Sequence, residues 1–330
     1  MRLPLLLAPA LLAGCAAAGP PPPPRGPLAF ADQPRTLDAQ LAAVRAAVAK
    51  YRDFSVAEAE GWRPFGGDEP LMGIHYAGPA PDYVHGDQLD FSQPNNLMYT
   101  DIDGQKVLTG VAFVVRIGDD EPVPEGFAGS ADRWHVHDFV RAIEAATEER
   151  PLLGWAANWW LDQNYRNKGD NRGRLAMAHV WVAIPNPDGI FADANRTLAY
   201  RKLDLPESYW RGASEEAARG LYLATPGGCE AVDGTLWIAT VKAEQERAIK
   251  AACQKAAGVV RAGLAAGGKE RVNRAGERAW AQFDAAWERI LTPAQKARVA
   301  AMSEHGSDGH GAGHDMRGDN GIDHGSHDEH

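Results

Sequence analysis

The run from residue 107 to residue 116 is apolar on both faces of the strand that it predicts. Val111 and Phe113 project to one side of an extended backbone, while Ala112 and Val114 project to the other. A strand of this kind has to be covered on both faces, which places it at the centre of a sheet. An Asp-Ile-Asp-Gly turn signal at 101–104 joins it to a second β-rich run, so we expect a hairpin and antiparallel pairing.

Helical and extended periodicities alternate along the rest of the chain. They predict an α+β fold, a small and mostly antiparallel sheet packed with helices, followed by a helical region. We expect an α+β domain over 30–205 and a helical region over 206–302. The expected helices are 36–51, 53–61, 141–149, 152–165, 207–223, 241–264, 270–290 and 293–302; the expected strands are 96–100, 107–116, 134–139, 175–184 and 235–240, with a loop from Trp62 that leads into a short strand carrying His75.

Four histidines lie in strand-forming, apolar surroundings. His135 and His137 are separated by one residue, so on a strand they share one face, and His75 and His179 are set in similar contexts. Imidazoles that converge in this way suit zinc, copper, iron or nickel, and a site needs three or four ligands near 2 Å. The alternative is that each histidine is a packing residue with one hydrogen bond. Two neighbours are weaker candidates: Asp138, which points away from His137, and His85, which lies in a loop.

The N-terminal segment has the pattern of a bacterial lipoprotein signal. Residues 1–14 carry one basic residue and a short apolar run, and they end in a Leu-Ala-Gly-Cys sequence at Cys15. We expect cleavage before Cys15, lipid on that cysteine, and a Pro-rich spacer to residue 29. Ala16, which follows the cysteine, favours the outer membrane. The predicted location is therefore the bacterial cell envelope, lipid-anchored on the periplasmic face. An ordinary secretion signal with a chance cysteine is the alternative.

Two further cysteines, Cys229 and Cys253, form an even pair in an oxidising compartment. They predict one disulfide, with two free thiols or a soft metal site as alternatives.

The C-terminal tail, 303–330, contains six of the 11 histidines and many Gly and acidic residues. It lacks the apolar residues of a core, so we expect it to be disordered. Histidine-rich tracts bind metal by composition, and these imidazoles are the candidate ligands: His305, His310, His314, His324, His327 and His330.

The net charge of -10, from 34 basic and 44 acidic residues, argues against a nucleic-acid partner. The expected partners are the lipid bilayer, through Cys15, and metal ions.

Several motifs together resemble a family of bacterial secreted proteins of unassigned function. These motifs are Met72-Gly73-Ile74-His75-Tyr76, Leu97-Met98-Tyr99, Leu108-Thr109-Gly110-Val111-Ala112-Phe113, Trp134-His135-Val136-His137, His179-Val180-Trp181 and Asn186-Pro187-Asp188-Gly189-Ile190-Phe191-Ala192. The resemblance covers about 35–195 and departs at Ala112-Phe113, where relatives tend to have Glu-Tyr. It brings no activity with it. Separately, Leu291-Thr292-Pro293-Ala294-Gln295 resembles the Leu-Thr-x-x-Gln element of periplasmic helical proteins linked to envelope stress and metal resistance.

These features favour a periplasm-facing lipoprotein that binds a transition metal, copper or zinc, through a folded histidine cluster and the tail. Two other classes remain open. One is a metal-dependent enzyme of unknown reaction, for which Asp68, Glu69 and Tyr76 are the nearby acids and bases. The other is a structural or interaction lipoprotein whose histidines are packing residues.

Overall fold

The computed structural model describes residues 34–79, 81–148, 150–164, 172–300 and 303–304. The predicted signal peptide, the predicted lipidation site Cys15 and the predicted spacer lie outside these residues. The tail histidines from His305 onward also lie outside them. The fold is α+β, as the sequence predicts. Within the described residues, no helix is both long and apolar enough to cross a membrane.

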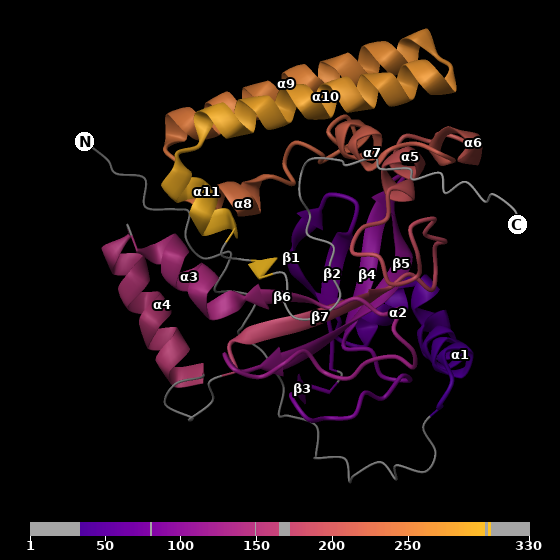
Figure 1. Ribbon diagram of the computed structural model, residues 1–330, viewed down its shortest axis with the longest axis vertical. Coiled ribbons are helices and arrows are strands. Elements are labelled where there is room, and N and C mark those ends of the chain that lie inside the picture. The colour runs from indigo at the N-terminus through magenta and orange to yellow at the C-terminus, as the bar shows by residue number, and fades with distance from the viewer. Residues whose placement is uncertain (1–33, 80, 149, 165–171, 301–302, 305–330) are drawn as a thin grey trace, which may run out of the picture.

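One curled sheet forms the centre of the molecule, and its order is β1-β2-β4-β5-β7-β6-β8 (Figure 1). Neighbours along this order pair antiparallel, whereas β3 lies off the path and pairs in parallel with the end of β5. The strands are β1 (Arg63–Glu69), β2 (Gly73–Ala77), β3 (Tyr83–Val84), β4 (Asn96–Ile102), β5 (Gln105–Ile117), β6 (His135–Asp138), β7 (Arg174–Val180) and β8 (Ser303–Glu304).

The long strand β5 is the central strand, as its two apolar faces predict. It pairs with β4 on one side and β7 on the other. The predicted hairpin joins β4 to β5 through Asp103 and Gly104, which both have positive φ (51° and 75°). This is the geometry of a type I′ turn, for which Asp-Gly is a preferred pair.

The two faces of the sheet carry different side chains. One face packs against the first helices in a large apolar core that includes Val44, Tyr99, Val111 and Phe113. The opposite face carries a smaller cluster with Met98, Met177 and Trp181. The period-two alternation of β5 and β7 sends neighbouring residues into these two clusters.

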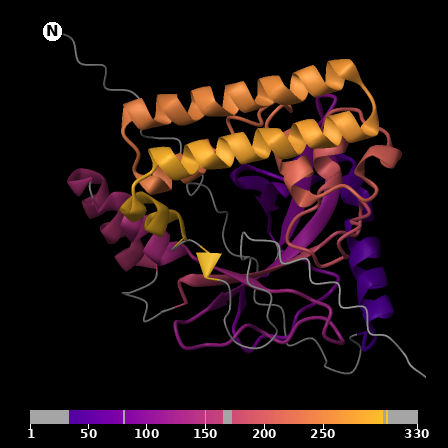
Figure 2. The same cartoon turned by 45° about the horizontal axis from the view of Figure 1, so that its top comes forward.

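Helices cover the sheet and extend beyond it. α9 and α10 form a long antiparallel hairpin across one end of the molecule, and α3 with α4 forms a second hairpin at its side (Figures 1 and 2). The helices are α1 (Leu37–Val48), the 3-10 helix η2 (Ala49–Arg52), α2 (Phe54–Ala59), α3 (Phe139–Thr147), α4 (Pro151–Asn164), α5 (Thr197–Lys202), α6 (Glu207–Trp210), α7 (Glu215–Tyr222), α8 (Asp233–Ala239), α9 (Ala243–Ala266), α10 (Lys269–Ile290) and α11 (Pro293–Ala300).

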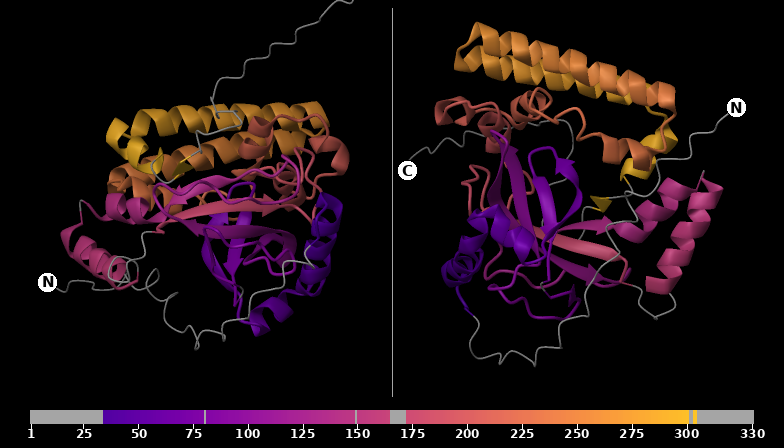
Figure 3. Two further views of the ribbon diagram at one scale, coloured as in Figure 1. Left: turned by 60° about the horizontal axis from the view of Figure 1, so that its bottom comes forward. Right: turned by 180° about the vertical axis from the view of Figure 1, so that it is seen from behind.

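The helical region has its own apolar core, which also takes in residues from the sheet region. Leu71, Ala199 and Tyr200 pack in the same cluster as α7, α9 and α10. The views in Figure 3 show the hairpin of α9 and α10 lying over the end of the sheet. The two regions expected from the sequence therefore share a core.

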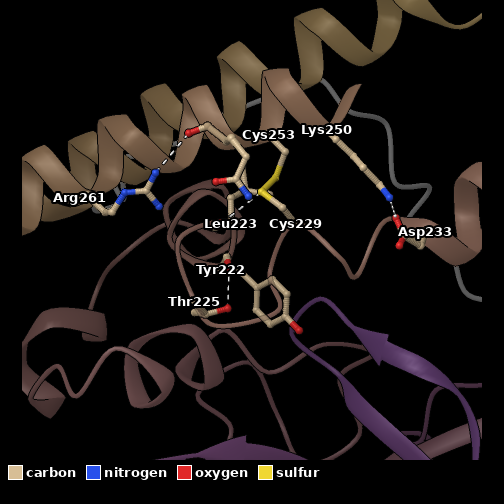
Figure 4. Close-up of a disulfide and its surroundings, with 9 residues drawn as sticks. Tyr222, Leu223, Thr225, Cys229, Asp233, Lys250, Cys253 and Arg261 are labelled. Atoms are coloured by element: carbon tan, nitrogen blue, oxygen red, sulfur yellow. Dashed lines mark hydrogen bonds and ion pairs between the residues drawn. A yellow bond between two sulfur atoms is a disulfide. The ribbon is translucent and has the colours of Figure 1, made fainter. Parts of the chain in front are cut away.

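A disulfide joins Cys229, in the turn after α7, to Cys253 in α9 (Figure 4). The predicted pairing is present in the structure, between cysteines that are 24 positions apart in the sequence and both buried. In the chain-entropy account, closing a loop of this length stabilises the fold by roughly 3 kcal/mol.

Three sequence predictions of local structure are wrong. The segment expected as a loop from Trp62 contains strand β1, because Pro64 is tolerated on an edge strand that pairs only with β2. The expected strand 235–240 is helix α8, in which Leu236 and Ala239 are buried against neighbouring helices. Tertiary packing there overrides the β-propensity of the segment.

The third concerns a break in a helix. The helix expected over 207–223 is divided into α6 and α7, with Gly212 between them in the left-handed region (φ 71°). Of the tail predicted to be disordered, the structure describes Ser303 and Glu304 alone; these two residues form β8 and pair with His137 and Val136.

Candidate functional site

The curl of the sheet brings His75 of β2 against His179 of β7. Three strand spacings separate β2 from β7, which would be roughly 14 Å in a flat sheet. Nevertheless the Nε2 atoms of the two rings lie 3.1 Å apart, and both residues are almost completely buried. This distance identifies the side of the sheet that carries Met98 and Met177 as the concave side.

Small residues on β5 leave room for this contact. Ala112, the pairing partner of His179, is buried on the same face. A Cβ atom added to Gly110 would lie 2.5 Å from the Val180 carbonyl oxygen, so β7 approaches β5 closely only because residue 110 is glycine. Larger side chains at positions 110 and 112 would occupy the space next to the contact between His75 and His179.

Strand β6 adds His135 and His137 to the same face, as their spacing predicts. The His135 ring centroid lies 4.9 Å from that of His179 and 4.9 Å from that of His137. Both residues are only partly buried, unlike His75 and His179. The four rings therefore run from the interior of the sheet toward its surface.

Asp193, in the loop after β7, contacts two of these histidines and is not among the site residues that the sequence predicts. Its backbone carbonyl lies 2.7 Å from Nδ1 of His179. A carbonyl can only accept, so Nδ1 of His179 donates, and the Nε2 atom of the neutral ring carries the lone pair. The Asp193 carboxylate lies 3.6 Å from Nδ1 of His135, a buried nitrogen that has no hydrogen-bond partner. Backbone carbonyls and carboxylates in these positions commonly orient metal-binding imidazoles.

Burial keeps the two inner imidazoles neutral. Burial first, and then the neighbouring His135 and His137, together lower the pKa of His75 to about 4. Burial also lowers the pKa of His179, as do His135 and His75, while the hydrogen bond to Asp193 acts in the opposite direction. Neutral imidazole is the form that binds a metal ion.

The distance between the two Nε2 atoms is close to that of a chelate. Two nitrogens bound tetrahedrally at 2.0–2.1 Å would be about 3.3 Å apart, so a shift of a few tenths of an ångström would admit an ion. The side chains as they stand are not a complete site. Among the described residues, no three or more His, Cys, Asp or Glu side chains are grouped to hold a metal ion.

The predicted acids and bases take other positions. Asp68 forms an ion pair with the buried Lys202, with Nζ and Oδ2 2.6 Å apart. Tyr76 points to the opposite face, where it packs against Phe54 and Tyr99. Glu69 has a raised pKa, chiefly through desolvation, which the charge of His135 opposes. Since Glu69 as a whole residue is exposed, we assign it no part in the site.

The two weaker histidine and aspartate candidates also lie elsewhere. Asp138 caps α3 by accepting a hydrogen bond from the backbone nitrogen of Arg141 at 2.8 Å. His85 lies 3.8 Å from a carboxylate oxygen of Glu121, in a different part of the molecule from the cluster.

Two surface hollows of the molecule do not include the histidines. One lies between α3 and α4, where Arg141, Glu148 and Trp155 line it. The other lies beside η2 and includes Tyr51 and Trp62. The histidine cluster therefore lies outside both of these hollows.

No protein-family model, curated protein or solved structure matches this chain. The geometry of the histidine cluster is therefore the basis for a functional proposal.

Proposed function

We propose that this protein binds a transition-metal ion of the copper or zinc class through His75 and His179, with His135 and His137 next to them. The observation that carries the proposal is the 3.1 Å separation of the Nε2 atoms of two buried imidazoles from distant strands. Burial disfavours the charged form of both imidazoles, so the pair is held neutral. The two Nε2 atoms are hydrogen-bonded to each other in this structure, and an ion bound between them would replace that hydrogen bond with two coordinate bonds once Nε2 of His75 gives up its proton.

His135 and His137 lie on the solvent side of this pair. A rotation of the His135 ring, which is already near His179, would bring a third nitrogen toward the ion. Asp193 would act as a positioning residue, because its backbone carbonyl keeps the proton of His179 on Nδ1 and leaves the lone pair on the Nε2 atom that faces His75.

The tail belongs to the same proposal. β8 pairs with β6 at Val136 and His137, so the six tail histidines follow in sequence directly after a strand beside the cluster. They would collect metal ions from solution and raise the concentration of metal near the folded site.

We further propose that the protein is anchored in the bacterial envelope through lipid on Cys15, on the periplasmic face of the outer membrane. The Leu-Ala-Gly-Cys sequence supports this proposal, and the Cys229–Cys253 disulfide is in keeping with an oxidising compartment. Replacing Cys15 with Ser tests the anchor. The protein with its native Cys15 should partition into detergent and into the outer-membrane fraction, whereas C15S should not. Equal partitioning of the two proteins would reject the lipid anchor.

Metal titration tests the folded site. The protein is first washed with a chelator, and its six tail histidines are replaced by Asn so that only folded ligands remain. We expect one equivalent of zinc or copper to bind, and H75Q or H179Q to weaken binding by about 100-fold or more, since even outer partners of a ligand contribute about 10–100-fold. The control is H85Q, a histidine outside the cluster, which should bind as the parent does. Equal binding by all three variants would reject the proposal.

A further inference from the structure

Two methionines lie beside the histidine pair on the concave face. Met98 of β4 is the direct pairing partner of His75, and Met177 of β7 is the direct pairing partner of His135. Residues opposite each other in antiparallel strands have Cβ atoms about 4.5–5.5 Å apart, close enough for their side chains to meet. Met177 also precedes His179 by two residues, so the two share a face of β7.

Both methionines are buried in one cluster. Met98 is 0% exposed and Met177 is 5% exposed, and they pack with Ala112, Trp181, Ile184 and Leu198. This cluster is distinct from the main core on the other face of the sheet, which contains no methionine. In the described part of the sheet, the thioethers are therefore placed on the face that carries the histidines.

The donor set around His75 and His179 is incomplete without them. Among the described residues, no group of three or more His, Cys, Asp or Glu side chains is arranged to bind a metal ion. A flexible thioether from Met98 or Met177 is the remaining soft donor type that the pairing register places next to the imidazoles. Thioether sulfur is a soft ligand that suits Cu(I), whereas carboxylate and water donors suit harder ions.

We propose that Met98 and Met177 supply thioether sulfur to the ion held by His75 and His179, and that the site is therefore selective for Cu(I) over Zn(II). The inference rests on the proposed metal-binding function, whose ligands are the histidines. It adds two ligands and a choice of metal. The site would be a mixed imidazole–thioether site, buried from water, with His135 and His137 on the side by which an ion enters.

The test uses full-length protein with the six tail histidines replaced by Asn. Cu(I) affinity is measured without oxygen by competition with bicinchoninate, and Zn(II) affinity by competition with a chromogenic chelator. Met→Leu keeps the volume and the apolar character of the side chain, so the fold should tolerate it. The control is Met72→Leu, which removes a thioether from the turn before β2 rather than from the concave face.

We expect M98L/M177L to lower Cu(I) affinity by about 10-fold or more while Zn(II) affinity stays within about three-fold, because zinc sites draw on imidazole, thiolate and carboxylate donors. M72L should change neither affinity. Unchanged Cu(I) affinity in M98L/M177L, together with its loss in H75Q, would overturn this inference and leave the proposed function intact. Absence of binding by the parent protein would remove both.

A second measurement covers the case in which M98L/M177L does not fold. X-ray absorption of the Cu(I)-loaded parent protein should show sulfur as well as nitrogen in the first coordination shell. Its cysteines do not compete as ligands in the folded part, because Cys229 and Cys253 are joined to each other. Cys15 is replaced by Ser in this sample. A shell of nitrogen and oxygen alone would overturn the inference.

Discussion

The backbone carbonyl of Asp193 accepts a hydrogen bond from Nδ1 of His179 at 2.7 Å, and this contact determines which nitrogen of His179 faces His75. The bond is made by the main chain, so it survives substitution of the Asp193 side chain. The carboxylate of the same residue faces His135 instead, at 3.6 Å from Nδ1. One loop residue is therefore placed to orient two imidazoles by two different groups.

Replacing Asp193 with Asn separates these two effects. Metal affinity should fall by about 10-fold, since the carboxylate near His135 is lost while the hydrogen bond to His179 remains. Competition titration of the variant lacking tail histidines measures the change. The matched control is D204N, which alters an exposed aspartate with positive φ, a conformation that asparagine also adopts readily. A fall of equal size in D204N, or none in D193N, would contradict a positioning role for the carboxylate.

The stability of the metal-free protein should decrease as the pH is lowered from about 6.5 to about 4. His75 has a pKa of about 4 in the folded state against 6.5 for an ordinary imidazole, so the unfolded chain binds more protons over this range. The stability associated with neutral, buried His75 is fully present above pH 6.5, and it is lost as the pH falls toward the folded-state pKa of about 4. For His75 alone the loss of unfolding free energy amounts to roughly 3 kcal/mol, and the lowered pKa of His179 adds to the loss in the same direction.

Urea unfolding at a series of pH values measures this dependence. The variant H75Q should show a shallower loss of stability between pH 6.5 and 4 than the parent, because glutamine does not titrate. H85Q is the control and should retain the parental slope. A parental slope in H75Q would show that His75 is not buried in its neutral form.

The folded site and the tail should release metal at different pH values. An imidazole in solvent is protonated near pH 6.5 and then no longer binds metal, whereas His75 remains neutral to about pH 4. At pH 7.5 the full-length protein should bind more metal than the variant without tail histidines. Near pH 5 the two should bind equal amounts, because only the folded site is still occupied. Equal stoichiometry at pH 7.5 would instead remove the tail from metal binding, and retention of the difference at pH 5 would assign tail binding to carboxylates.

Reduction of the Cys229–Cys253 disulfide should destabilise the helical region. The bridge ties the turn after α7 to α9, and Asp233 forms a further ion pair with Lys250 of α9 at 3.0 Å (Figure 4). The double variant C229S/C253S should lose roughly 3 kcal/mol of unfolding free energy. Alkylation of the native protein should modify neither thiol before reduction and both after it. Free alkylation of both in the native protein would reject the bridge.

The sequence was informative where local pattern decides structure. The two apolar faces of the 107–116 run predicted the central position of β5, and Asp103-Gly104 predicted its hairpin. The single-residue spacing of His135 and His137 predicted their common face. Each of these features depends on side-chain alternation or turn chemistry, which neighbouring residues determine.

The contact between His75 and His179 depends on the curl of the whole sheet, which no local pattern encodes. The sequence grouped these histidines by context, and the structure places their rings together. Asp193 was missed because its contact with His179 is made by a backbone carbonyl, which every residue possesses. It follows directly after the Asn-Pro-Asp-Gly-Ile-Phe-Ala motif at 186–192, and that proximity to His179 in the chain was the available signal.

Location of the ion is the most direct test of the central claim, that His75 and His179 share one metal. Crystals of the protein are soaked separately with zinc and with copper, and anomalous difference maps are recorded at each metal's absorption edge. We expect a peak about 2 Å from Nε2 of both histidines, with the two nitrogens moved slightly apart from their 3.1 Å separation. A fully loaded crystal with no peak between these rings, and with the nitrogens still hydrogen-bonded to each other, would contradict it.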